Sequence, residues 1–268
     1  MGALEFSAAA SGALPLYIVP KNHLPEALSV AAPSILGWAS CASFTGGAGE
    51  VLVVRSEDGT PRAALVGLGD ATDRARKRFV AGGARSKLPK GTFRLANADL
   101  DGLDPDELCL GWLLAGYRFD RYKSGSAPEA ALVAPKGVDA PRLEAIASGE
   151  ALTRDLINTP ASDMGPEELE TEARTLASEF GASIDVISGE ALIDRNFPMI
   201  HTVGRASPRQ PRLIDLRWGA TGPRVTLVGK GVCFDTGGLN LKPGASMGLM
   251  KKDMGCLLYT SDAADELT

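Results

Sequence analysis

The sequence predicts an α/β fold, because short β-branched and apolar runs alternate along the chain with longer helical segments. At 268 residues the chain is long enough for two domains, and its 44% hydrophobic content can supply real cores. No repeat or low-complexity block interrupts it. We therefore expect an N-terminal α/β domain over residues 1–135, followed over residues 136–255 by a linker helix and the start of a second domain.

The N-terminal domain is expected to contain four strands and two helices, and a third helix leads into the second domain. Residues 67–70, rich in glycine, resemble a nucleotide-binding loop only faintly and are better interpreted as a strand-end turn. Residues 121–128 are expected to be a loop, and residues 136–141 to open the helix that leads into the second domain. The expected strands cover residues 15–19, 50–55, 63–68 and 92–96, and the expected helices cover residues 71–82, 105–117 and 142–158.

The second domain is expected to begin with a helix over residues 166–180. Glu167, Glu168 and Glu170 lie in its first turn, where carboxylates complement the helix dipole. Three runs then predict strands, and with this helix they predict a βαβ-like beginning. These runs cover residues 184–187, 212–216 and 225–228, of which the last alternates and is rich in β-branched residues.

Composition narrows the class of protein. The 28 basic and 33 acidic residues give a net charge of −5, which provides no electrostatic reason to expect a nucleic-acid or anionic-membrane partner. No apolar run approaches membrane length, and no signal peptide is evident, so we expect a cytoplasmic protein. The four cysteines show no paired spacing and are expected to be reduced. With only two histidines, a His-rich zinc site is excluded, and so is a conventional Ser-His-Asp hydrolase unless one of them serves.

The most informative stretch covers residues 228–243, directly after the last predicted strand. Gly229 and Gly231 flank Lys230, and glycines there permit close backbone approaches at a strand end, where α/β sheets bind ligands. A Walker-type loop is excluded, because Gly231 stands where Ser or Thr should follow the lysine. A dinucleotide-binding fingerprint is excluded as well, because Phe234 replaces its third glycine.

The spacing instead resembles the leucyl aminopeptidase (cytosol aminopeptidase) family of two-metal enzymes. That family has a lysine, an aspartate five residues on, a second lysine and a second aspartate, and this sequence supplies Lys230, Asp235, Lys242 and Asp253. Two upstream segments resemble the family's catalytic domain in the same order, residues 153–166 and residues 203–207, the latter running into the strand at 211–217. The resemblance implies a macro-like N-terminal α/β domain followed by the incomplete start of an α/β/α aminopeptidase domain.

The resemblance also implies a role for each site residue. Asp235 would bridge two divalent cations, while Asp253 and Lys230 would each ligate one, the lysine as a neutral amine that burial and nearby cations favour. Lys242 would stay charged and polarise the scissile carbonyl, and Met250 would line the pocket for the first substrate side chain. Two such metals activate a water and stabilise the oxyanion. Oxygen ligands without histidine suit manganese, zinc or magnesium.

The implied activity is release of N-terminal amino acids, with leucine-type preference, from peptides by a homo-oligomer that the family forms as a hexamer. The family continues with a later stretch that carries two further carboxylate ligands and an arginine. Here residues 256–268 resemble a translated sequencing adapter and are expected to be non-native. We therefore expect this chain to be a fragment of an active parent protein and to be inactive by itself.

Each residue of the motif also has a simpler interpretation when taken alone. Lys230 would be a solvated loop lysine, Asp235 a turn or cap residue, and Cys233 a small buried residue. Only the joint spacing favours a metal site. The alternative function is a non-catalytic α/β binding or oligomer-assembly module. The presence or absence of an Asp-x-Glu-x-Arg segment downstream in the parental gene discriminates between the two.

Overall fold

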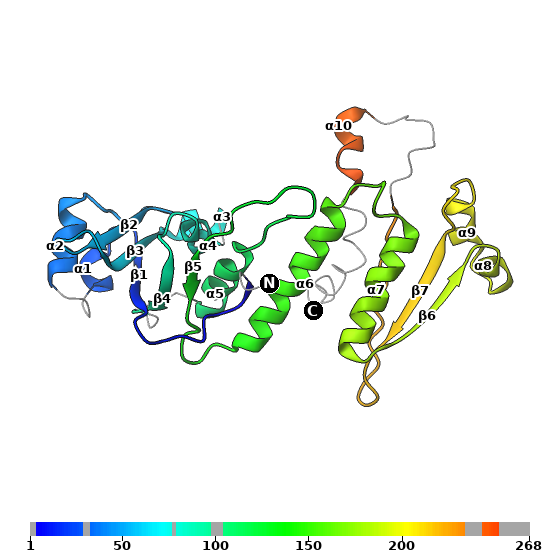
Figure 1. Ribbon diagram of the computed structural model, residues 1–268, viewed down its shortest axis with the longest axis horizontal. Helices are drawn as coiled ribbons and strands as arrows, with labels where there is room; N and C mark the ends of the chain where they lie inside the picture. The colour runs from blue at the N-terminus through cyan, green and yellow to red at the C-terminus, as the bar shows by residue number, and fades with distance from the viewer. Residues whose placement is uncertain (1–3, 29–32, 77–78, 98–103, 234–242, 252–268) are drawn as a thin grey trace. The chain divides into compact units, whose positions relative to one another are not determined.

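The computed structural model describes residues 4–28, 33–76, 79–97, 104–233 and 243–251. The chain divides into two compact units, Met1–Ala151 and Leu152–Thr268. Helix α6 crosses this boundary, and each unit has its own sheet (Figure 1). Because the placement of the two units is not determined, each unit is described by itself.

The N-terminal unit is built on a five-stranded sheet with the order β2-β3-β1-β4-β5. The central strand β1 runs parallel to both of its neighbours, and only β2 is antiparallel to its partner β3. Parallel neighbours require crossover connections, which the helices of this unit provide. The strands are β1 (Leu14–Pro20), β2 (Val51–Arg55), β3 (Pro61–Gly69), β4 (Gly91–Leu95) and β5 (Ala130–Leu132).

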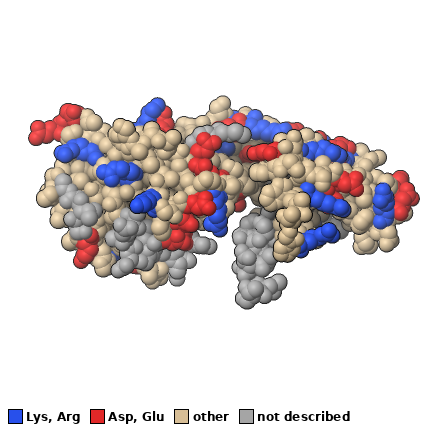
Figure 2. Space-filling view, turned by 90° about the horizontal axis from the view of Figure 1, so that it is seen from below, with Lys and Arg blue, Asp and Glu red and all other residues tan. Residues whose placement is uncertain are grey.

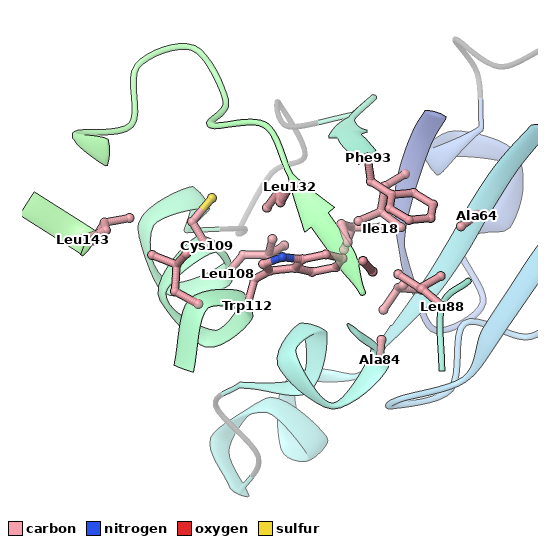
Figure 3. Packing of buried hydrophobic residues seen from close by; sticks show 14 of the residues in the cluster. Ile18, Ala64, Ala84, Leu88, Phe93, Leu108, Cys109, Trp112, Leu132 and Leu143 are labelled. Atoms are coloured by element: carbon pink, nitrogen blue, oxygen red, sulfur yellow. The ribbon is translucent and has the colours of Figure 1, made fainter. Parts of the chain in front are cut away.

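Successive side chains of β1 point to opposite faces of the sheet, and each face is covered by its own core. Leu16 and Ile18 pack into one core with the helices α4, α5 and α6, while Tyr17 and Val19 pack into another with α1 and α2. Figure 3 shows the first core, in which Trp112 lies between its own helix and the sheet. The helices of this unit are α1 (Leu24–Ala27), α2 (Pro33–Cys41), α3 (Ala71–Arg76), α4 (Val80–Arg85), α5 (Pro105–Leu114) and α6 (Ala140–Asn158).

A buried arginine ties the short edge strand β5 to two helices. The Arg85 side chain is 2% exposed, and it donates from Nε to the carbonyl of Ala130 and from Nη1 to the carbonyl of Trp112, both at 2.9 Å. Its guanidinium also lies 5.5 Å from the centroid of the Trp112 ring. Burial lowers the pKa of Arg85 to about 10, which still leaves it charged at neutral pH. The cation thus holds β5 in place through backbone carbonyls.

The C-terminal unit has a two-stranded antiparallel sheet beside α7 (Figure 1). The two strands pair over their full length, from Ser183 opposite Arg217 to Ser188 opposite Arg212. Helix α7 has local start and stop signals, with Pro166 at its first position and Gly181 in the left-handed conformation (φ 65°) at its end. The elements are α7 (Pro166–Phe180), β6 (Ser183–Ser188), α8 (Ala191–Asp194), α9 (Pro198–Gly204), β7 (Arg212–Arg217) and α10 (Gly244–Met247).

Most expected elements are confirmed, and the α/β class with them. The strands expected in the N-terminal half appear as β1 to β4, and residues 121–128 have no regular structure. Of the glycine-rich residues 67–70, the first three complete strand β3, and Asp70 then accepts the N–H of Asp73 at 3.0 Å as α3 begins. The single helix expected over residues 71–82 is wrong in extent, since Phe79 lies in a turn and α4 runs on to Arg85. No helix among the described residues is long and apolar enough to cross a membrane.

Two expectations for the second unit are wrong. The βαβ-like beginning fails because β6 and β7 are antiparallel, and the short helices α8 and α9 return the chain to the same end of the sheet instead of crossing it. The strand expected over residues 225–228 is not formed, and Val225 and Val228 are 76% and 80% exposed. A strand needs a neighbour for its backbone hydrogen bonds, and no described segment pairs with this run.

Candidate functional site

The structure describes two of the five predicted site residues. Lys230 is exposed in a segment without regular structure, and Met250 is half-buried just after α10. Asp235, Lys242 and Asp253 lie outside the described residues. Within the described ranges no three His, Cys, Asp or Glu side chains form a group that could hold a metal ion. The convergence of the four motif residues on one cavity therefore stays a prediction.

Cys233 anchors the described end of the motif segment. It is half-buried and packs against a small apolar cluster of Leu156, Met164 and Leu169. Burial raises the pKa of the Cys233 thiol to about 11, and the nearby charge of Glu168 acts in the same direction. The neutral thiol is a poor nucleophile. Cys233 is thus a packing residue, as the sequence indicated, although it is only half-buried.

The cluster under Cys233 belongs to the connection between α6 and α7. A turn closes this connection, with the N–H of Asp163 donating to the carbonyl of Pro160 at 2.9 Å. At the start of α7, Glu168 accepts the N–H of Gly165 at 2.8 Å. This is one half of a capping box, and it is the only half that a glycine at the N-cap position permits. The N–H of Gly165 holds the pKa of Glu168 below its ordinary value, so this acceptor stays ionised.

The described residues at the C-terminal end of the motif contact the same connection between α6 and α7. Nζ of Lys251, one residue after Met250, donates to Oδ1 of Asn158 at the C-terminal end of α6, at 3.4 Å. Cys233 before the undescribed residues 234–242, and Lys251 shortly after them, thus both contact the segment from α6 to α7. This segment is the platform to which both described ends of the motif attach.

Two arginines near the start of β7, Arg209 and Arg212, pair with carboxylates near the start of α7. Arg212 pairs with Glu167 at 3.1 Å and with Glu170, and its side chain is only 10% exposed. Although burial opposes it, hydrogen bonds from Arg174 and Arg212 lower the pKa of Glu170. The sequence indicated these carboxylates only as helix-dipole residues. Arg212 lies more than forty positions from both Glu167 and Glu170, so no local pattern could have identified it as their partner.

Arg209 has a different set of partners, which lie in the connection itself. It bonds the carbonyls of Ala161 and Ser162 and contacts Glu168 at 3.3 Å. On the face shown in Figure 2, basic and acidic side chains are interspersed among the described residues. The described part of the second unit is thus organised by arginine–carboxylate pairs around a small apolar cluster.

Comparison with known proteins identifies the family. Residues 14–135 match the M17 aminopeptidase N-terminal domain, and residues 151–260 match the catalytic domain of the cytosol aminopeptidase family. A probable cytosol aminopeptidase of Syntrophotalea carbinolica is 36% identical over 242 residues, which cover 79% of this chain and 48% of that protein. One of Bradyrhizobium sp. is 34% identical over 255 residues, covering 86% of this chain and 51% of that protein. The chain belongs to the M17 cytosol aminopeptidase family.

Solved structures agree with this assignment. The cytosol aminopeptidase from Coxiella burnetii superposes with a TM-score of 0.83 at 34% identity, over 98% of this chain and 57% of that one. The bottromycin maturation enzyme BotP, solved in complex with Mn, gives a TM-score of 0.69 at 30% identity, over 92% of this chain and 53% of that one. The chain thus spans about half the length of the curated relatives it matches.

Proposed function

We propose that this chain is part of a metal-dependent aminopeptidase that releases N-terminal residues, with leucine-type preference, from peptides. The observation that carries the proposal is the match of residues 151–260 to the family's catalytic domain, because this range contains all the motif residues at the family spacing. The relatives named cytosol aminopeptidase support peptide substrates and a cytoplasmic location. We further propose that the whole protein assembles as a homo-oligomer, a hexamer by family resemblance.

The proposed site would hold two divalent cations. Asp235 would bridge them, and Asp253 and Lys230 would each ligate one. Carboxylate oxygens and an amine suit manganese, zinc or magnesium, and the manganese complex of BotP supports manganese for a relative. Lys230, the one member of this donor set that the structure describes, is exposed, and Cys233 three positions later packs against an apolar cluster.

The remaining motif residues would bind substrate. Bound metals would supply an activated water and stabilise charge on the carbonyl oxygen. Lys242 would polarise the scissile carbonyl with its ammonium group, and Met250 would contribute apolar surface to the pocket for the first side chain. Since Met250 is half-buried just after α10, its side chain is partly shielded from solvent even in this chain.

The 268-residue chain by itself is proposed to be inactive. By family resemblance it contains three of five metal ligands, and the missing carboxylates include one that bridges the metals. Two adjacent dications need that negative charge to be held together. The proposed two-domain organisation is a macro-like domain over residues 1–135 and the start of the catalytic domain over residues 136–255, with a non-native stretch at 256–268.

Hydrolysis of leucine p-nitroanilide tests the proposal. The 268-residue chain is assayed with manganese beside a full-length version restored from the locus, and only the restored protein is expected to turn over substrate. Asp235→Asn in the restored protein is expected to abolish turnover, whereas Asp185→Asn, an exposed aspartate on β6, leaves it unchanged. Turnover by the short chain comparable to that of the restored one contradicts the proposed inactivity. Absence of turnover from both proteins contradicts the aminopeptidase proposal and favours the binding or assembly module.

A further inference from the structure

Arg209 joins three parts of the C-terminal unit through one guanidinium group. Its Nη2 donates to the carbonyl of Ser162 at 2.8 Å, and its Nη1 lies 3.4 Å from the carbonyl of Ala161 and 3.3 Å from Oε2 of Glu168. The same carboxylate oxygen accepts the N–H of Gly165. A planar fork of donors can serve two carbonyls and a carboxylate together, which a lysine ammonium on a flexible stem does less well.

The backbone around Met164 is shaped to receive this guanidinium. A Cβ added to Gly165 would overlap Nη1 of Arg209, so only glycine permits the close approach. Met164 lies between the carbonyl of Ser162 and the N–H of Gly165, and its side chain is 2% exposed. Arg209 and its carboxylate partner therefore fix the main chain on both sides of a buried methionine.

Met164 in turn supports the motif segment. It forms the apolar cluster with Leu156 and Leu169, and Cys233 packs against this cluster. Cys233 follows Lys230 by three positions and precedes Asp235 by two. Because packed side chains transmit a displacement of their neighbours, a shift of Met164 changes the surface on which the motif rests.

We propose that Arg209 is a positioning residue for the metal-binding segment, acting through the 161–165 backbone, Met164 and Cys233. The catalytic consequence of this inference rests on the proposed function. The structural part of the inference concerns only described residues. Groups that hydrogen-bond metal ligands commonly change metal affinity by about tenfold or more when they are lost, and Arg209 would act on the segment from one packing layer further out.

Arg212 provides a matched control. It begins β7 three positions later, is more buried than Arg209, and pairs with Glu167 and Glu170 of the same helix. Among the described residues, its hydrogen bonds go to Gln210, Glu167 and Glu170 and to no atom of the 161–165 connection. Arg212→Ala should therefore destabilise the unit at least as much as Arg209→Ala without loosening the support of Cys233.

Alkylation of the cysteines measures the support directly in the 268-residue chain. Peptide-resolved mass spectrometry with iodoacetamide follows Cys233, with exposed Cys41 reporting reagent activity and buried Cys109 reporting opening of the N-terminal unit. We expect Arg209→Ala to speed alkylation of Cys233 about tenfold relative to Cys109. Because Cys233 is half-buried against the apolar cluster, a faster reaction reports opening of that cluster.

The variants separate positioning from general loosening. Arg209→Lys, which keeps the charge and is expected to fold, should give an intermediate rate, and Arg212→Ala should leave the Cys233 rate relative to Cys109 within about twofold. An unchanged Cys233 rate in both Arg209 variants overturns the proposal. An equal rise in Arg212→Ala overturns it as well, because general destabilisation then explains the effect.

A second arm connects the inference to the proposed chemistry. In the restored full-length protein, Arg209→Ala should raise the manganese concentration for half-maximal activity about tenfold, while Arg212→Ala leaves it within about twofold. An unchanged manganese requirement in Arg209→Ala overturns the catalytic part of the inference. If the restored wild-type protein is inactive, the proposed function fails, and the alkylation rates still decide the structural part.

Discussion

The two units of this chain differ in how completely their sheets are paired and covered, and the difference shows which apolar runs become strands. In the N-terminal unit, β1 has hydrogen-bonded neighbours on both edges and a core on each face. In the C-terminal unit, the equally apolar run 225–228 pairs with no described strand and is exposed. Apolar character alone thus does not make a strand, because the backbone also needs a partner for its hydrogen bonds.

The largest expected effect compares a tryptophan from each unit. Trp112 is 1% exposed and Trp218 is 73% exposed. Trp112→Ala should reduce the free energy of unfolding of the N-terminal unit by about 3–5 kcal/mol, because it leaves a cavity in the core. Trp218→Ala should change stability by less than about 0.5 kcal/mol. Urea denaturation followed by circular dichroism measures both, and similar losses would contradict the contrast between the units.

A smaller loss is expected for the buried arginine of the first unit. Arg85→Met removes the donors to the carbonyls of Ala130 and Trp112, and leaving buried acceptors unsatisfied costs about 1–3 kcal/mol each. We expect a total loss of about 2–4 kcal/mol by the same denaturation measurement. Arg62→Met, at an exposed position of β3, is the control and should be nearly neutral. A neutral Arg85→Met would mean that apolar packing alone holds β5.

A pair of valines tests the unpaired run itself. Val66 in β3 is 1% exposed, whereas Val228 is 80% exposed. Val66→Thr buries a hydroxyl and should reduce stability by about 1–2 kcal/mol, and Val228→Thr should have no measurable effect in this chain. Thermal denaturation of the two variants provides the measurement. A clear loss of stability in Val228→Thr would show that residues 225–228 pack in solution.

The smallest expected effect is the contribution of Glu168, in the second unit, to the pH dependence of stability. The folded pKa of Glu168 lies below its ordinary value of 4.5, so its contribution to stability is present above that value and is lost as pH falls through the folded pKa. Because its ion pair is partly exposed, the contribution should be about 0.5 kcal/mol. Urea titrations between pH 3 and about pH 6 should show this slope. Glu168→Gln should flatten it, and an unchanged slope would assign the dependence to other carboxylates.

Local signals explain the elements that the sequence predicted well. Helix α7 was expected over the range that the structure shows, since Pro166 can start a helix and Gly181 can adopt the left-handed conformation that ends it. The strand β1 was expected because its apolar run fits a sheet buried on both faces. The motif spacing from Lys230 to Asp253 indicated the family, which the matches to both family domains confirm.

Elements without a local signal were missed. Strand β5 has three residues, and it exists because β4 provides an edge and Arg85 holds its first carbonyl. Helices α8 and α9 are too short for a clear period, yet they return the chain and make β7 antiparallel to β6. Such features depend on neighbours that are distant in sequence, which no pattern along the chain contains.

The sequence by itself determined the α/β class, most strand and helix ranges of the first unit, and the family to which the motif belongs, because these depend on periodicity, end signals and the spacing of residue types. Only the tertiary structure decided that the run 225–228 lacks a partner, that Arg85 is buried, and that Arg209 supports Met164 beneath Cys233. The reason is physical: burial and pairing are properties of the assembled neighbours. A residue acquires them only when segments far apart in the chain come together.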